Sequence, residues 1–376
     1  VLDFSGRNID NNLAGSYDVE ATSIAWRVTD DISIRASEQT AVKAPAIGSL
    51  FQPQITSYAF ARPDPCDFRY RGTGRAPDVR EANCLAEGLA PDFVSIAVNA
   101  SVQGLSGGNP NLENEIGETS SVGLIYQPSW FADVLVGDLS FSADYIKINL
   151  DDYITSFSLG QNLVACYDFE DYPNRYCDNF QRDADGQIVY WEAGLVNAGL
   201  IEFATYIWNA DYLVDASELI SFVTRDNVAT DLGSFAVRWR AYQQVYYLDA
   251  ASGDPDDLVD TTGEFGNDEW FYDTTIEYRY NDFYAYLVGN SRSGGKINVF
   301  QQYDDQYLDL DGNPISEFKG YTFWNAGFGY QVNDGLSLRL IFNNVMDYDG
   351  TEDVFTREAD IISVGRTVTA GFNWRF

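Results

Sequence analysis

The four cysteines are the side chains whose chemistry is easiest to assign. The chain has 376 residues and no His, which excludes Ser-His-Asp and Cys-His triads and histidine-ligated zinc or haem. The cysteines form two close pairs, Cys66 with Cys84 and Cys166 with Cys177, and neither pair has the C-x-x-C spacing of zinc fingers or thioredoxin motifs. Four free thiols in a cytosolic chain would leave this pairing unexplained. We therefore predict two disulfides and an oxidising compartment.

Acidic side chains are the second group that could do chemistry. Asp and Glu number 57 against 23 Lys and Arg, for a formal charge of −34, so no nucleic-acid partner is expected, because phosphate binding needs a basic face. Asp183–Gly186 and Asp309–Asn313 resemble fragments of calcium loops, but an EF-hand needs more ligands, so we interpret them as ordinary Asp-Gly turns and predict no metal site. The acidic clusters at 254–260 and 304–305 are interpreted as solvated charge, as cation bridges to lipopolysaccharide or as attractors of a cationic ligand or metal chelate.

Carboxylates are abundant, but nothing in the sequence holds two of them at the defined separation that a glycosidase needs. We therefore expect neither an enzyme nor a cofactor.

The elements that must position these groups are β-strands, because apolar and polar residues alternate with a period of two. The end of the chain is the clearest case, where Val368, Phe372 and Phe376 share one face and Asn373 and Arg375 share the other. Reading backwards from there gives about eleven strands. They lie near residues 16–28, 32–42, 118–128, 139–150, 200–214, 235–248, 269–280, 283–291, 321–332, 336–345 and 364–376.

The connections between these strands alternate in length. Asp30-Asp31, Asn281-Asp282 and Asn333–Gly335 are tight turns, whereas residues 43–117 and 151–199 are long. Short turns at one end and long loops at the other are typical of a transmembrane antiparallel β-barrel in an outer membrane. If the C-terminus is periplasmic, the tight turns are periplasmic and both cysteine pairs are extracellular. A soluble β-sandwich would also alternate, but it has no reason to keep its long loops at one end.

The strand count has a consequence for the barrel. An odd number cannot close an ordinary bacterial barrel, and the first expected strand, 16–28, runs inward whereas a complete barrel starts with an outward strand. We therefore expect further strands before Val1, and about eleven more would give the 22 of the large plugged transporters. The expected structure is an open, curved sheet with Phe376 facing outward and Arg375 inward.

Five stretches resemble the barrel of TonB-dependent receptors, in the family's order over nearly the full chain. The stretch 39–51 (QTAVKAPAIGSLF) is similar to the family's S-x-R-A-P-x-I-x-E-L-F, with Lys43 at the position of the family's Arg. The stretch 108–115 (GNPNLENE) is similar to G-N-P-x-L-x-P-E. The others are 139–149, 343–347 (NNVMD) and the terminal strand 371–376 (GFNWRF).

The resemblance implies that residues 1–376 are the C-terminal part of one barrel domain, with the plug domain and earlier strands outside them. The expected function is TonB-dependent import of a scarce siderophore, vitamin or oligosaccharide across the outer membrane of a Gram-negative bacterium. The implied partners are the TonB complex through the plug, lipopolysaccharide and outer-membrane lipid, with a lid lipoprotein as a further candidate. A terminal aromatic such as Phe376 resembles the signal read by the barrel-assembly machinery. A non-energised porin-like barrel and a secreted β-rich adhesin or filament subunit are the alternatives.

In such a receptor, loops 43–117 and 151–199 would cap the lumen. Their aromatic side chains are our candidate ligand-binding residues, because such rings stack on sugars or on aromatic siderophores. Packing within the loops is an equal alternative. These residues are Tyr58, Phe60, Phe68, Tyr70, Tyr167, Phe169 and Tyr172.

Overall fold

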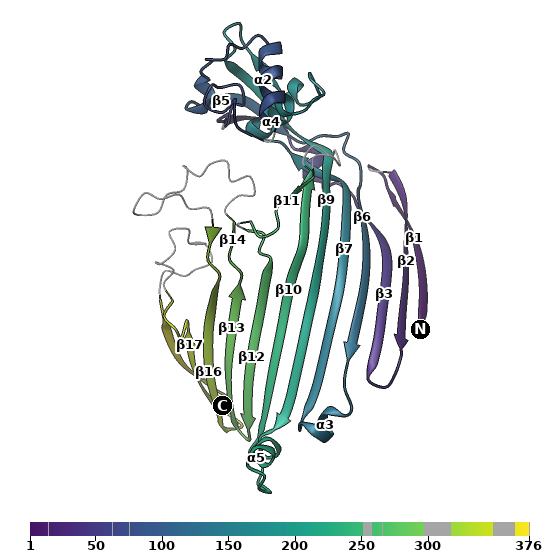
Figure 1. The fold of residues 1–376 in the computed structure, drawn as a ribbon, viewed down its shortest axis with the longest axis vertical. Helices are drawn as coiled ribbons and strands as arrows, with labels where there is room; N and C mark the ends of the chain where they lie inside the picture. Colours follow the sequence, from purple (N-terminus) through teal and green to yellow (C-terminus); the bar gives the residue numbers. More distant parts are fainter. Residues whose placement is uncertain are drawn as a thin grey trace.

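The structure, a computed structural model, describes residues 1–375 with gaps at 14, 62, 75, 251–257, 265, 297–316 and 349–364. The described residues form a long antiparallel sheet with a small folded unit at one end (Figure 1). Phe376 and the acidic segments 304–305 and 309–313 lie outside the described residues, as does most of the cluster 254–260.

One path of neighbouring strands makes what we call the wall. Its order is β1-β2-β3-β6-β7-β9-β10-β12-β13-β16-β17-β18, so neighbours in the sequence are neighbours in the sheet, as in up-and-down barrels. The strands are β1 (Leu2–Asn11), β2 (Gly15–Arg27), β3 (Ile32–Lys43), β6 (Glu115–Tyr126), β7 (Asp138–Ser156), β9 (Ile188–Asp215), β10 (Ser234–Ala250), β12 (Trp270–Tyr280), β13 (Phe283–Arg292), β16 (Tyr321–Asn333), β17 (Leu336–Asn343) and β18 (Thr367–Trp374). The antiparallel sheet of the sequence prediction is confirmed.

The wall has twelve strands within the described residues, one more than the sequence analysis gives. The additional strand is β1, which pairs with β2 from Leu2–Ile24 to Asn11–Gly15. Only Leu2 and Phe4 mark an apolar face in β1, because its second half is mostly polar, and the alternation is too short to detect. The prediction that the first strand runs inward is therefore wrong, since β1 is antiparallel to β2.

One face of the wall is apolar and exposed. Alternate residues of a strand point the same way, and the register aligns them across strands, since Ile34 pairs with both Trp26 and Leu124. Val122 and Phe372 on this face are 57% and 68% exposed. A β-sandwich would cover such side chains with a second sheet, so the sandwich alternative is wrong. A face of this kind suits contact with lipid.

The opposite face of the wall is polar, as the lumenal face of a barrel would be. Arg35 on β3 and Asp144 on β7 form an ion pair with 2.6 Å between Nη2 and Oδ2. Arg240 on β10 pairs with Asp211 on β9 over 2.8 Å. The second pair joins neighbouring strands, whereas the first reaches across β6, which lies between β3 and β7. Both pairs add side-chain links to the backbone ladder.

The connections differ between the two ends of the wall. The predicted tight turns join β2 to β3, β12 to β13 and β16 to β17, and Asn281 takes the left-handed backbone conformation, with a φ of 49°, that asparagine tolerates well. Helices α3 (Phe131–Val134) and α5 (Ala216–Thr224) lie at the same end (Figure 1). Among the described residues, no helix has the length and apolar character needed to cross a membrane.

The other end carries what we call the cap, residues 47–114 and 157–198 (Figure 1, top). In the cap, β5 pairs in parallel with the upper part of β9, and β8 pairs with it in the antiparallel direction. Strand β4 pairs with β5. The elements of the cap are α1 (Ile47–Phe51), β4 (Ile55–Ala59), α2 (Pro77–Ala86), η1 (Ile96–Val98), β5 (Val102–Gly107), α4 (Leu159–Asp168), η2 (Cys177–Asn179) and β8 (Phe180–Arg182). Three short strands near the same end are β11 (Val259–Asp260), β14 (Gly295–Lys296) and β15 (Glu317–Phe318).

Candidate functional site

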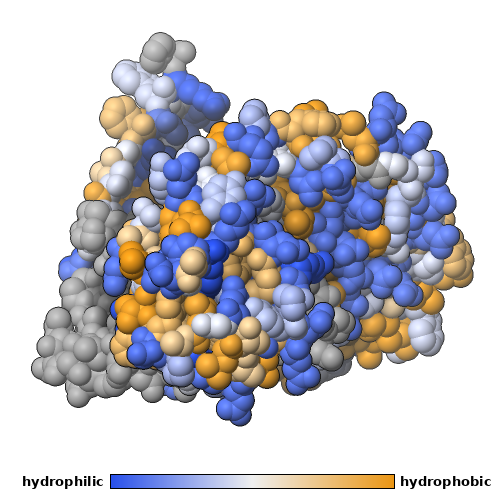
Figure 2. Space-filling model, turned by 90° about the horizontal axis from the view of Figure 1, so that it is seen from above, coloured by the Kyte–Doolittle hydropathy of each residue, from blue (hydrophilic) through white to orange (hydrophobic). Residues whose placement is uncertain are grey.

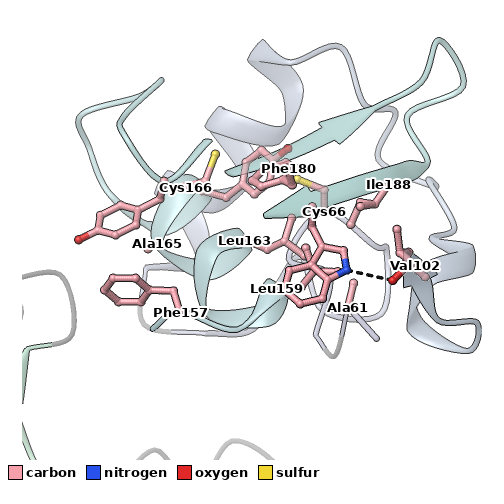
Figure 3. Packing of buried hydrophobic residues seen from close by; sticks show 14 of the residues in the cluster. Ala61, Cys66, Val102, Phe157, Leu159, Leu163, Ala165, Cys166, Phe180 and Ile188 are labelled. Atoms are coloured by element: carbon pink, nitrogen blue, oxygen red, sulfur yellow. Dashed lines mark hydrogen bonds between the residues drawn. The ribbon is translucent and has the colours of Figure 1, made fainter. Parts of the chain in front are cut away.

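The two long loops fold together around one hydrophobic core (Figure 3). Val102 of the first loop belongs to the same buried cluster as Leu159, Leu163 and Trp191 of the second. The indole Nε1–H of Trp191 donates to the carbonyl oxygen of Val102 over 2.9 Å, so the polar end of this buried ring is satisfied across the two loops. The two loops that were predicted to cap the lumen therefore form one folded unit.

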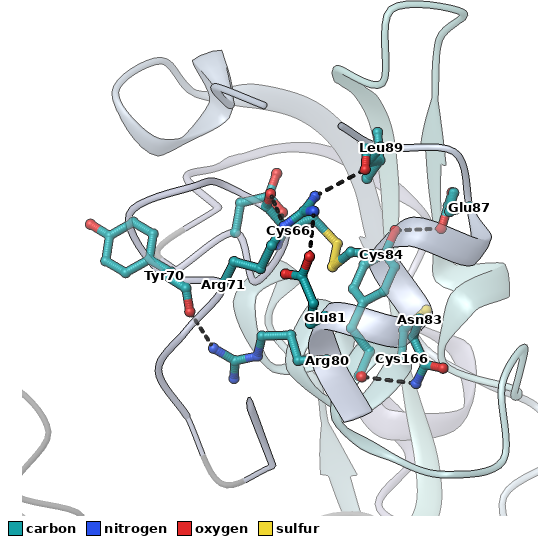
Figure 4. Close-up of a disulfide and its surroundings, with 12 residues drawn as sticks. Cys66, Tyr70, Arg71, Arg80, Glu81, Asn83, Cys84, Glu87, Leu89 and Cys166 are labelled. Carbon is teal, nitrogen blue, oxygen red and sulfur yellow. Dashed lines mark hydrogen bonds and ion pairs between the residues drawn. A yellow bond between two sulfur atoms is a disulfide. The ribbon is translucent and has the colours of Figure 1, made fainter. Parts of the chain in front are cut away.

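Both predicted disulfides are present in the cap, and the prediction is confirmed. Figure 4 shows the bond between Cys66 and Cys84. Cys66 is bonded to Cys84 on α2, and Cys166 on α4 is bonded to Cys177. Each bond closes a loop within one half of the cap. The two halves are joined by other contacts.

Buried ion pairs connect the two halves of the cap. Arg80 on α2 holds both carboxylate oxygens of Asp168 at 2.5 and 2.6 Å, and both side chains are almost fully buried. Arg182 on β8 holds Asp64 at 2.8 Å. Burial alone would lower the pKa of Arg182, but the charge and hydrogen bonds of Asp64 and of the Tyr167 hydroxyl outweigh it and raise this pKa. Each pair joins a residue of the first loop to a residue of the second.

Glu87, an exposed residue of the cap, is hydrogen-bonded to the hydroxyls of two tyrosines. The hydroxyls of Tyr167 and Tyr172 each donate to Glu87 Oε2 over 2.6 Å, and Arg182 Nε donates to the Tyr167 hydroxyl over 2.9 Å. Burial, followed by the negative charge of Glu87, raises the pKa of both tyrosines. These hydroxyls stay protonated at neutral pH and hold the cap together.

The structure divides the seven aromatic candidates into two groups. Tyr167 is fully buried, and Phe169 and Tyr172 pack against the core of the cap. Tyr58, Phe60 and Phe68 are exposed, and Tyr70 is half-buried. Seen from above, hydrophobic side chains form scattered patches among hydrophilic ones (Figure 2). The exposed rings have the access that a ligand requires, and their role in binding stays a prediction.

A cavity of about 440 Å³ lies at the base of the cap. It is bounded by residues 108–110, the G-N-P sequence that resembles the family motif, and by the upper part of β9. Asn109 of this stretch donates its Nδ2–H to the carbonyl oxygen of Leu195 on β9 over 2.8 Å. A Cβ at Gly108 would come within 2.8 Å of the Gln52 backbone nitrogen, so only glycine fits there. Arg175 and Glu192 also line this cavity.

The two ends of the first loop meet at a further ion pair. Lys43 ends β3, Glu115 begins β6, and Lys43 Nζ lies 2.5 Å from Glu115 Oε2. Glu115 is buried and also accepts from the backbone N–H of Ile154 on β7 over 3.0 Å. Lys43, which departs from the family's usual Arg, therefore still supplies a cation where the loop leaves the wall.

The wall changes character below the cap. On β7, Phe141, Ala143 and Tyr145 share the outer face with Val122, but above them the large apolar side chains Ile146 and Ile148 lie on the lumenal face, in line with Asp144. Lys147 lies on the outer face there, near Glu202. With 19 residues, β7 is longer than the ~9 to 11 residues that a strand needs to cross a bilayer, so in a membrane its upper part would project beyond the hydrocarbon.

A second cavity, of about 580 Å³, lies on this upper lumenal face, and we call it the wall cavity. Its lining comes from five neighbouring strands and the loop before β12. The lining residues are Ile148, Leu150, Ile201, Phe203, Tyr242, Gln244, Tyr247, Gly266, Asn267, Asp268, Phe271 and Arg292. The sequence analysis singled out none of them, although the switch of the apolar face along β7 was a signal that could have pointed there.

The expected turn at Asp183–Gly186 is present. The Asp183 carboxylate accepts from the backbone N–H groups of Asp185 and Gln187 over 3.0 and 2.9 Å, and Gly186 has a φ of 80°. The carboxylate is thus used within an Asp-Gly turn, as the sequence indicates.

Comparison with protein families gives one result for nearly the whole chain. Residues 3–345 match the family described as "TonB dependent receptor-like, beta-barrel". No curated protein sequence matches the chain.

Solved structures with similar folds include a siderophore receptor and a ferric enterobactin receptor. The siderophore receptor PirA from Acinetobacter baumannii is 13% identical with a TM-score of 0.57, over 100% of this chain and 43% of that one. A ferric enterobactin receptor mutant, PfeA from Pseudomonas aeruginosa in complex with enterobactin, is 11% identical with a TM-score of 0.57, over 99% and 43%. These identities support the fold alone, and the chain spans under half the length of either receptor.

Proposed function

Because the chain belongs to the TonB-dependent receptor-like β-barrel family, we propose that it supplies barrel wall and extracellular cap to an active importer in the outer membrane of a Gram-negative bacterium. Its ligand is a scarce siderophore, vitamin or oligosaccharide. Its proposed partners are the TonB complex through a plug domain, lipopolysaccharide and outer-membrane lipid, with a lid lipoprotein as a further candidate. Residues 1–376 are proposed to be the C-terminal part of one barrel domain.

The observation that carries the proposal is the position of the folded cap above the wall cavity. The cap is built on an extension of β9, and the cavity is lined by lower residues of the same strand, including Ile201 and Phe203. A ligand held by the cap would therefore meet the wall cavity next on its way into the lumen. A passive pore needs an open mouth, and a cap with its own buried core favours capture over free diffusion.

Uptake measurements test the energised part of this proposal. The gene would be expressed in strains with and without a functional TonB complex, supplied with ferric siderophores, cobalamin or maltooligosaccharides at limiting concentration. We expect uptake of one class, and its loss in the strain without TonB. Uptake that is unchanged in that strain would support the porin-like alternative instead.

Substitutions on the cap test the aromatic candidates. We expect Tyr58→Ala, Phe60→Ala and Phe68→Ala to weaken ligand binding, because stacking of a ring on an aromatic side chain contributes ~0.5–1.5 kcal/mol. Phe4→Ala on the outer face of the wall is the control, since this ring is also exposed but faces away from the lumen. Binding that is equal in all four variants would remove these rings from the site.

Point substitutions are a cleaner test than deletion of residues 52–107. That deletion is expected to abolish binding and leave an inserted barrel. It would also strip Leu159, Leu163 and Trp191 of their packing partners, so the rest of the cap would unfold for reasons unrelated to ligand contact.

A further inference from the structure

One face of the upper part of β9 forms a side of the cavity of about 440 Å³ at the base of the cap, which we call the cap cavity. Every second residue of this stretch lines it, namely Glu192, Gly194, Val196 and Ala198. Because alternate residues of a strand share a face, their side chains point to the cavity side. A Cβ at Gly194 would meet no other atom of the described residues within 4 Å. This face of β9 therefore looks onto open space that a ligand can enter.

The charged side chains that line the cap cavity are accessible. Glu192 and Arg175 are both exposed. Within the described part of the chain, the Glu192 carboxylate accepts one hydrogen bond, from the Tyr190 hydroxyl over 3.0 Å, and so keeps further lone pairs for a ligand. The Arg175 guanidinium lies 4.9 Å from the centre of the Tyr176 ring, which holds a planar set of N–H donors at the edge of the cavity.

An amide from the first loop completes the polar part of the lining. Gln54 is exposed and lines the cap cavity. A Cβ at Gly107 would come within 2.9 Å of Gln54 Cδ, so the amide lies against bare glycine backbone, which a larger residue would not permit. An amide offers a donor and an acceptor side by side. The cavity thus presents an acceptor at Glu192, donors at Arg175 and both kinds of group at Gln54.

The remaining part of the lining is apolar and belongs to the cap core. Phe157 is buried in the core, and Val196 packs against it. A sugar ring has C–H groups on its faces and hydroxyls around its edge, and each hydroxyl both donates and accepts. An apolar surface beside an acceptor, donors and an amide matches this distribution, because the C–H face covers the apolar side chains while the hydroxyls keep hydrogen-bond partners.

Charge separates a sugar from an anionic siderophore as the occupant. The chain has a formal charge of −34, and the arginine that lines the cap cavity, Arg175, is accompanied by Glu192. A ferric tris-catecholate is a polyanion, and it would find no net positive charge in this cavity. A neutral polyhydroxyl ligand meets no such repulsion.

We propose that the cap cavity binds a neutral sugar unit of an oligosaccharide. The C–H face of the sugar lies against Phe157 and Val196, and its hydroxyls are held by Glu192, Gln54 and Arg175. This inference rests on the proposed import function and selects the oligosaccharide from the three ligand classes named there.

Filling the cavity is the sharpest test. The native-length protein in nanodiscs would be screened on an array of neutral oligosaccharides, and the tightest binder would be titrated by calorimetry. Gly194→Phe places a ring in the open space and should raise the Kd roughly a hundredfold or more, because the sugar is excluded from all its contacts. Gly72→Phe is the control, since a Cβ at this exposed cap glycine would also meet no atom of the described residues within 4 Å, and Gly72 does not line the cavity.

Single polar groups give smaller expected effects. Glu192→Ala removes a charged acceptor and should raise the Kd roughly ten- to a hundredfold, and Gln54→Ala should raise it roughly three- to tenfold. Gln103→Ala, which removes an exposed amide on β5 outside the cavity, should leave the Kd unchanged. Hydrogen exchange of the cap amides would identify any variant whose cap is misfolded.

The outcomes separate the site, the ligand class and the import function. A folded Gly194→Phe protein that binds the sugar as tightly as wild type would overturn the site. Binding of no sugar, or tighter binding of a ferric tris-catecholate or of cobalamin than of any sugar, would overturn the ligand class. TonB-dependent uptake that Gly194→Phe leaves unchanged would reject the cavity proposal alone, whereas sugar binding without TonB-dependent uptake would reject the import proposal alone.

Discussion

The wall and the cap of this molecule differ in how they shield apolar side chains from water. On the wall, Val122 and Phe372 are more than half exposed, and their face has no covering layer among the described residues. In the cap, Leu159, Leu163 and Tyr167 are fully buried in a core shared by two loops. The wall therefore depends on lipid as its solvent, whereas the cap is built like a small water-soluble protein with disulfides.

Ion pairs differ in the same way, since those compared here are exposed on the wall and buried in the cap. Arg240 and Asp211 on the wall keep 43% and 41% of their side chains exposed, whereas Arg80 and Asp168 in the cap keep 2% and 3%. Exposed pairs contribute little because water screens them, but a buried charge that loses its partner is strongly unfavourable. The comparison teaches that the same type of contact has different consequences in the two regions.

The largest expected effect follows from breaking a buried pair in the cap. Arg80→Met removes the guanidinium that is paired with the buried Asp168 carboxylate and should destabilise the cap by about 3–5 kcal/mol. Hydrogen exchange of cap amides would measure the loss, while the heat-induced gel shift would follow the barrel.

Arg240→Met on the wall is the matched control, with an expected cost of about 0–1 kcal/mol. Replacing both partners, as Arg80→Met with Asp168→Leu, should recover much of the loss. Equal losses in the two single variants would contradict the proposed difference between cap and wall.

A charge placed on the outer face of the wall gives the second-largest effect. Val122→Arg would put a guanidinium among lipid chains, at a cost of about 2–4 kcal/mol near the middle of the bilayer. Ser121→Arg, one residue away on the lumenal face, should cost less than half as much. Folding yield into vesicles at increasing urea would measure both. If Ser121→Arg were the more damaging change, the two faces would have been assigned the wrong way round.

The sequence predicts the wall far better than the cap, for a physical reason. The wall's contacts join strands that follow one another, so period-two alternation at residues such as Val368, Phe372 and Trp374 is enough to place them. The cap's contacts join distant positions, and no local pattern links Asp64 to Arg182 or Val102 to Trp191. The cysteine pairs were predictable because each lies within one loop.

The candidate site shows the same limit. Exposed rings such as Tyr58 and buried rings such as Tyr167 have the same local sequence character, so the sequence could not separate them. The wall cavity depends on a bulge at Val245, which a strict alternation misassigns by one residue.

Removing a disulfide should have a smaller effect than removing Arg80. Cys166→Ala with Cys177→Ala opens a loop with a sequence separation of 11, which the chain-entropy model values at about 2.8 kcal/mol. The α4 amides should exchange faster, while the heat-induced gel shift of the barrel should be unchanged. Because both cysteines lie in the cap, a loss of barrel stability of similar size would show that cap and wall unfold together.

The smallest expected effect is a loss of cap stability at acid pH, which comes from the carboxyl group of Asp67. Burial alone would raise the pKa of this carboxyl, but hydrogen bonds from the Arg69 side chain and from the backbone N–H groups of Arg69 and Ser95 outweigh it and lower the pKa. A lowered folded-state pKa contributes stability that is present above the unfolded value of about 3.9 and is lost as the pH falls through the folded value.

The cap should therefore lose stability below about pH 4, and Asp67→Asn should make that loss shallower. Asp92→Asn, an exposed change in the same loop, is the control. Because Arg69 keeps 35% of its side chain exposed, the contribution is smaller than that of Arg80 and Asp168. Thermal unfolding of the cap between pH 7 and pH 2 would measure it. An acid loss as steep in Asp67→Asn as in wild type would assign the pH dependence to other carboxylates.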